Sequence, residues 1–229
     1  MTKNQQILAK MGGGSLALLL SLSLGQQASA ATLVENLSQL TNQGFQVKNN
    51  QWLSSSFQTG NVSYGYTLNS VTLRIGQSTL GSLFVKLYSN VVGNPGTEIT
   101  SFNVPSIGGT NNYDFTLTNS QLLTANTTYW LVAGILSGSG EYVWAKTNST
   151  AETGLPGWSI GDLAFFSTDG GNIWNSFVSP EPFQFSVNGT VNTPPPPPTN
   201  IPEPGSVVAL LGLGGLGLAS RLKKLSTRA

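Results

Sequence analysis

The chain has 229 residues with ten basic and nine acidic side chains, and its formal net charge is +1. It contains no histidine, which excludes Ser-His-Asp and Cys-His catalysis and histidine-based metal sites. It contains no cysteine, so a folded domain must depend on its hydrophobic core without help from disulfides.

The first thirty residues have the pattern of a secretory signal peptide. Lys3 and Lys10 give a positively charged start, residues 16–24 form an apolar run, and Ala28 and Ala30 frame a small-x-small cleavage site. We therefore expect residues 1–30 to form a signal helix, to engage the secretory translocon and to be cut by signal peptidase after Ala30.

The positive charges are concentrated at the two ends of the chain. Residues 31–201 contain eight acidic and four basic side chains, which leave this region a net charge of −4. A nucleic-acid-binding domain normally carries a basic patch. We therefore expect no nucleic-acid partner.

Residues 31–44 form a short lead with a helical pattern. Leu33, Leu37 and Leu40 recur at the spacing of one helix face. We therefore expect this lead to be helical and to precede the folded domain.

Residues 45–191 have the period-two pattern of β-strands. Val71, Leu73 and Ile75 alternate with polar residues, and similar stripes recur between Gly-rich turns. Short strands at regular spacing predict an all-β fold, a single antiparallel β-sandwich of the jelly-roll type.

Several stretches of this region resemble the choice-of-anchor R domain of bacterial surface proteins. The resemblance implies a β-sandwich joined to a C-terminal anchor, with no defined activity. The stretches that carry it are Phe57-Gln-Thr-Gly, Tyr66-Thr-Leu-Asn-Ser-Val-Thr-Leu, Val85-Lys-Leu-Tyr-Ser-Asn, Pro95-Gly, Leu123-Thr-Ala-Asn-Thr-Thr-Tyr-Trp-Leu-Val, Gly157-Trp and Trp174.

The segment from Ser167 to Trp174 is similar to an Asp-box, a Ser-x-Asp-x-Gly-x-x-Trp hairpin found in many β-proteins. We interpret it as a structural turn in which Asp169 caps backbone amides. Asp162 and Asp169 are weak calcium candidates, because the Asp-x-Asp-x-Asp-Gly spacing is missing. We expect no cofactor.

The carboxylates also support an alternative function. Two of them could act as the acid and base of a polysaccharide hydrolase. The candidates, none of which lies in a catalytic motif, are Glu141, Glu152, Asp162 and Asp169.

Aromatic side chains are the main binding candidates, because exposed aromatic faces stack on sugar rings. They are also the large residues that a disulfide-free core needs. Trp158 follows a Pro-Gly turn, so we expect it to be exposed, and Trp144 and Trp174 are the further candidates.

The C-terminal part begins with a spacer. Residues 192–201 include five consecutive prolines, which favour a stiff polyproline II segment. Residues 202–229 follow with Pro202-Glu203-Pro204, a Gly-rich apolar run and a basic tail. The apolar run would form a transmembrane helix of roughly 20 Å, short against a hydrocarbon core of about 30 Å.

The order of these parts resembles the PEP-CTERM protein-sorting signal of Gram-negative bacteria. The residues that carry it are Pro202, Glu203 and Pro204, followed by Arg221, Lys223, Lys224 and Arg228 as a basic stop-transfer tail. The resemblance implies processing by an exosortase, with membrane anchorage that is at least transient. The destination it implies is the cell surface or extracellular matrix.

The leading hypothesis is a non-enzymatic exported protein that associates with extracellular polysaccharide or the cell envelope. The hydrolase is the first alternative. The second is a surface protein whose tail is never cut, so that the membrane anchor becomes permanent.

Overall fold

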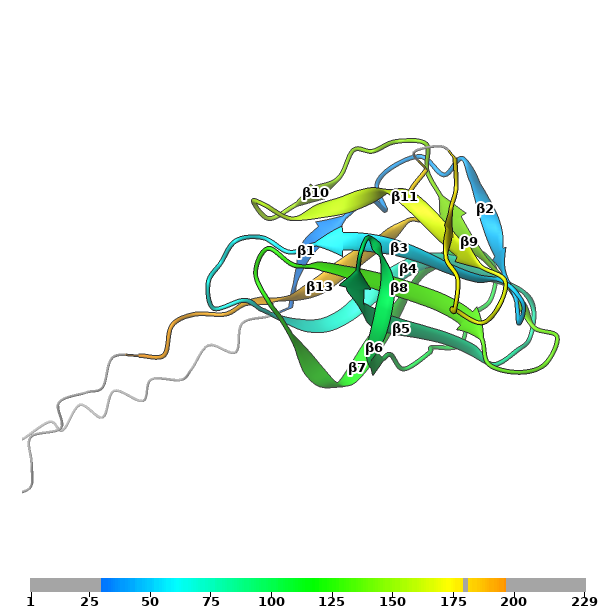
Figure 1. Ribbon diagram of the computed structural model, residues 1–229, viewed down its shortest axis with the longest axis horizontal. Helices are drawn as coiled ribbons and strands as arrows, with labels where there is room; N and C mark the ends of the chain where they lie inside the picture. Colours follow the sequence, from blue (N-terminus) through cyan, green and yellow to red (C-terminus); the bar gives the residue numbers. More distant parts are fainter. Residues whose placement is uncertain (1–29, 179–180, 197–229) are drawn as a thin grey trace, which may run out of the picture.

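The computed structural model describes residues 30–178 and 181–196, which form two antiparallel β-sheets (Figure 1). The seven-stranded sheet has the order β10-β1-β13-β4-β9-β2, with β7 also paired to β4, and the six-stranded sheet has the order β12-β11-β3-β8-β5-β6. The strands are β1 (Ala31–Glu35), β2 (Gln43–Val47), β3 (Trp52–Gln58), β4 (Tyr66–Thr79), β5 (Leu83–Val91), β6 (Asn94–Ser101), β7 (Asn111–Leu123), β8 (Thr128–Ile135), β9 (Glu141–Lys146), β10 (Thr153–Gly154), β11 (Ser159–Ser167), β12 (Asn175–Ser176) and β13 (Phe185–Val191).

The hydrophobic core is built from alternate residues of the strands. In β4, Val71, Leu73 and Ile75 are fully buried. In the neighbouring strand β13, Phe185 lies opposite Leu73 and Val187 lies opposite Val71. Burying each such side chain stabilises the fold by roughly 1.5–3 kcal/mol. The predicted all-β, antiparallel, sandwich-like fold is therefore confirmed.

The prediction of a helical lead at residues 31–44 is wrong. Ala31–Glu35 forms strand β1, which pairs with β13 through Val34 opposite Val187. Leu33 and Val34 are both fully buried, whereas Leu40, the last leucine of the proposed helix face, is 87% exposed. Pairing with β13 thus outweighs a weak helical pattern, and the sheet starts at residue 31 instead of 45.

Asn36 directly follows β1 and joins it to the chain at the start of β13. Its side-chain amide donates to the carbonyl of Phe183, and its side-chain oxygen accepts from the amide of Phe185. The side chain is buried with both of these groups bonded. It therefore holds the beginning and the end of the domain together.

The chain leaves the sheets after β13 (Figure 1). Residues 193–196 of the predicted linker are exposed and belong to no strand. The predicted signal helix, apart from Ala30, and the predicted transmembrane helix at residues 202–229 lie outside the described residues. Within the described part of the chain, no helix is long and apolar enough to cross a membrane.

Candidate functional site

The outer face of the six-stranded sheet carries a hollow of about 440 Å³, which we call the outer groove. Ser56 and Trp130 are paired neighbours on the central strands β3 and β8, so their side chains share one face of the sheet. Strand β11 borders them on one side, and β5 with the turn that follows it borders them on the other. The lining residues are Ser56, Asn90, Gly93, Thr128, Trp130, Gly161, Asp162, Leu163 and Phe165.

Trp130 is held rigidly in this groove. Its indole N–H donates to the side-chain oxygen of Asn90 at 2.9 Å. The ring of Phe165 meets it edge-on, with 4.9 Å between ring centroids. These neighbours leave Trp130 only 3% exposed, although it lies on the face opposite to Tyr129, which belongs to the core. Trp130 therefore shapes the groove more than it offers a bare stacking surface.

The accessible surface of the groove mixes apolar and hydrogen-bonding groups. Leu163 is 39% exposed, and Phe165 is half-buried beside it. Asp162 and Asn90 are exposed, and Thr128 is half-buried between them. A carboxylate and an amide oxygen accept hydrogen bonds, whereas an amide nitrogen and a hydroxyl donate them. Such a set suits a neutral polyhydroxylated ligand such as a sugar chain.

A second hollow of about 410 Å³ lies beside the same β5–β6 hairpin. Asn172, Ile173 and Trp174 line it from the Asp-box loop, and Val91 with residues 94–97 of the hairpin completes it. Trp174 is half-buried there. Of the three tryptophans predicted to bind sugar, it is the one that the structure places at a hollow of this size.

Asp169 caps the Asp-box turn, as its sequence predicts. Its carboxylate accepts from the amides of Asn172 and Ile173 at 3.1 and 3.0 Å, and from the Ser167 hydroxyl at 2.7 Å. The Ile173 amide, followed by the Ser167 hydroxyl, holds the pKa of Asp169 below its usual range. The charged form of Asp169 is therefore a structural part of the loop.

This arrangement predicts a pH-dependent loop. Because the folded state lowers the pKa of Asp169, its contribution is present above the unfolded pKa and is lost as the pH falls through the folded value. We expect the Asn172 and Ile173 amides to exchange faster with solvent on acidification, measured by hydrogen exchange corrected for intrinsic rates. In Asp169→Asn this acid-induced change should disappear, and a loop equally protected at all pH values in the wild type would contradict the assignment.

The other three candidate carboxylates lie in different surroundings. Glu152 accepts from the amide of Ile160 at 2.5 Å, and burial together with the charge of Asp162 raises the pKa of Glu152. The hollow that these two carboxylates line has no room for a water molecule. Glu141 instead pairs with Lys48. Within the described part of the chain, no three acidic, histidine or cysteine side chains gather as a metal site.

The expectation that Trp158 is exposed is wrong. It is 6% exposed because it stacks on Phe57, with 6.0 Å between centroids and 12° between planes, and meets Tyr66 edge-on at 4.8 Å. Trp144 is fully buried and stacks on Phe183. Neither ring can stack on a sugar, because core side chains cover the faces of both rings.

Sequence reasoning did not single out Asn90, Thr128 or Leu163 as binding residues. They belong to β5, β8 and β11, and only the pairing of these strands brings them to one face. The only signal for this face in the sequence was the alternation of side chains along β8. Trp130 lies next to core-facing Tyr129, so alternation alone directs Trp130 outward.

The predicted sorting residues lie beyond the described residues, so the sequence itself identifies them. Residues 200–224 match the PEP-CTERM protein-sorting motif family. The C-terminal segment is a PEP-CTERM sorting signal. The match includes the Pro202-Glu203-Pro204 motif and the basic residues Arg221, Lys223 and Lys224, whereas Arg228 lies past its end.

The PEP-CTERM signal indicates an exosortase substrate that is exported and passes through a membrane-anchored stage on its way to the surface. The comparisons with curated proteins and with solved structures found no match. The resemblance of the body to choice-of-anchor domains remains a prediction, as does signal-peptide cleavage after Ala30, at the site framed by Ala28 and Ala30.

Proposed function

We propose that this exosortase-sorted protein is a non-enzymatic, polysaccharide-binding component of the cell surface or extracellular matrix. In this proposal, signal peptidase removes residues 1–30 and the PEP-CTERM signal delivers the β-sandwich to the outside. The outer groove then holds a segment of extracellular polysaccharide. The observation that carries the proposal is the groove itself, with its mixed apolar and hydrogen-bonding lining.

The size and position of the groove support a polymer ligand. Its volume of about 440 Å³ falls in the range of small-ligand sites. The second hollow borders the same β5–β6 hairpin as the outer groove. A chain of sugars could therefore contact Leu163 and Asp162 at one point and Trp174 at another.

The alternative of a hydrolase has less support. A glycosidase needs an acid and a base on opposite sides of the scissile bond, with space for substrate between them. Glu152 has the raised pKa of an acid, but the hollow that it shares with Asp162 is too narrow to admit a water molecule. The geometry thus favours binding without cleavage.

The test is affinity electrophoresis of the full-length chain, in mild detergent, through gels containing the host's extracellular polysaccharide. We expect retardation, and we expect Thr128→Arg, which fills the groove, to weaken the apparent affinity by about tenfold or more, equivalent to roughly 1.4 kcal/mol. Leu122→Arg is the matched control, because Leu122 is 61% exposed on β7 of the other sheet.

Two results would overturn this proposal. One is wild-type mobility that no host polysaccharide changes. The other is equal retardation of the wild type and Thr128→Arg, which would move binding away from the outer groove. Release of new reducing ends from the polymer would instead favour the hydrolase.

A further inference from the structure

Lys146 is a buried lysine at the end of β9. It is 4% exposed, and its Nζ lies 4.5 Å from the centroid of the Phe45 ring. The described residues contain three ion pairs, and the lysine side chains of the other two, Lys48 and Lys86, are 36% and 19% exposed against 5% for Lys146. Burying a charge is costly unless the charge is paired, so the groups that surround the Lys146 amine must compensate for its burial.

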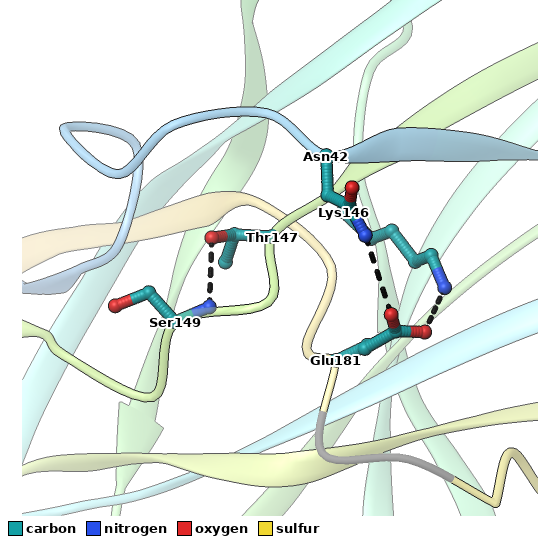
Figure 2. Close-up of polar contacts among 5 residues, drawn as sticks. All are labelled: Asn42, Lys146, Thr147, Ser149 and Glu181. Atoms are coloured by element: carbon teal, nitrogen blue, oxygen red, sulfur yellow. Dashed lines mark hydrogen bonds and ion pairs between the residues drawn. The ribbon is translucent and has the colours of Figure 1, made fainter.

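Glu181 connects Lys146 to Asn42. One oxygen of its carboxylate pairs with Nζ of Lys146, and the other accepts from Nδ2 of Asn42 at 3.3 Å (Figure 2). The backbone amide of Asn42 also donates to the carbonyl of Lys146 at 2.9 Å. An amine and a carboxamide thus lie on the two oxygens of one carboxylate, at the adjoining ends of β2 and β9.

We propose that Lys146 and Asn42 join in an intramolecular isopeptide bond, with Glu181 as the proton-transfer catalyst. Nζ of Lys146 attacks Cγ of Asn42, the new Nζ–Cγ bond forms, and the Cγ–Nδ2 bond breaks. Of the three protons of the Lys146 ammonium, one stays on the new amide. The other two pass through Glu181 to Nδ2, which leaves as ammonium, so the step needs no oxidant and no further reactant.

The surroundings suit this reaction. The Phe45 ring and the burial of Lys146 keep water from the attacking amine. Glu181 has a side chain that is only 22% exposed, and this partial burial strengthens its electrostatic effect. Asn42 is exposed, so the released ammonium has a path to solvent. The carboxylate touches both reacting groups, which fixes them in one orientation.

A matched comparison lies at the other end of the same strand pair, with Lys48 just after β2. Lys48 pairs with one oxygen of Glu141 at 3.3 Å, and Gln46 donates to the other at 2.8 Å. These three residues repeat the amine, carboxylate and carboxamide, but Lys48 is 36% exposed. Because water solvates this amine, we expect no bond there.

The bond would have a clear structural role. β2 is the edge strand of the seven-stranded sheet and pairs with β9. A link from Asn42 to Lys146 would fasten that edge and close a long loop of the chain, as a disulfide does in other exported proteins. This chain has no cysteine with which to make one.

The test is peptide mass spectrometry of the folded, full-length chain after digestion with a protease that does not cut at lysine. We expect a branched peptide that joins Asn42 to Lys146 and is lighter than its two parts by one ammonia. The branched peptide should be lost completely in Lys146→Arg and in Glu181→Gln. It should persist in Lys48→Arg, the control at the exposed triad.

The wild-type measurement decides the matter even if a variant fails to fold. Recovery of Asn42 and Lys146 only in separate, unmodified peptides would overturn the proposal and leave a non-covalent ion pair. A link from Lys146 to any other residue would overturn it as well.

Discussion

Replacing Trp144 by alanine is expected to lower the free energy of unfolding by about 3–5 kcal/mol, the usual range for removing a buried aromatic ring. Trp144 is fully buried, its ring stacks on Phe183 at 4.7 Å, and its indole N–H donates to the carbonyl of Gln184 at 3.0 Å. The variant would lose this packing and this hydrogen bond together. The chain has no disulfide to limit the damage.

Urea denaturation followed by circular dichroism measures this effect. The control is Leu122→Ala, which removes a side chain that is 61% exposed and should change the free energy of unfolding by no more than about 0.5 kcal/mol. If the two variants lose the same amount, Trp144 is not the core residue that its contacts indicate.

The positions of several strands could be predicted because each has one face in the core. Val71, Leu73 and Ile75 recur every second residue, and a period of two belongs to a half-buried strand. The strand within the lead at residues 31–44 could not be predicted in this way, because Leu33 and Val34 are consecutive and are both buried in β1. Two adjacent buried residues break the alternation where the β1–β13 register shifts.

The proposed binding surface was less predictable than the fold. Local sequence suggested that Trp158 is exposed because it follows a Pro-Gly turn, yet the turn folds it onto Phe57 and Tyr66. The outer groove combines Ser56, Thr128 and Asp162, which strand pairing alone brings together. A composite surface of this kind has no sequence motif, whereas the sorting signal is contiguous and could be identified directly.

Because the sorting motif consists of three consecutive residues, a small change there should have a large effect on where the protein ends up. Replacing Pro202, Glu203 and Pro204 by alanine is expected to abolish exosortase processing. The full-length tail would then stay in the membrane fraction. The physical reason is that alanines remove the two proline rings, which restrict backbone rotation, together with the one negative charge of the motif.

Fractionation and intact mass of the exported protein test this prediction. Alanine substitution of Pro195, within the spacer, is the control, because it leaves four of the five consecutive prolines and the whole sorting motif in place. We expect the wild type and this control to end before Ala229 and to leave the membrane. If both instead retain Ala229, the tail is a permanent anchor, and the uncleaved surface protein becomes the correct description. The polysaccharide-binding test does not depend on this outcome, because the outer groove belongs to the β-sandwich and not to the tail.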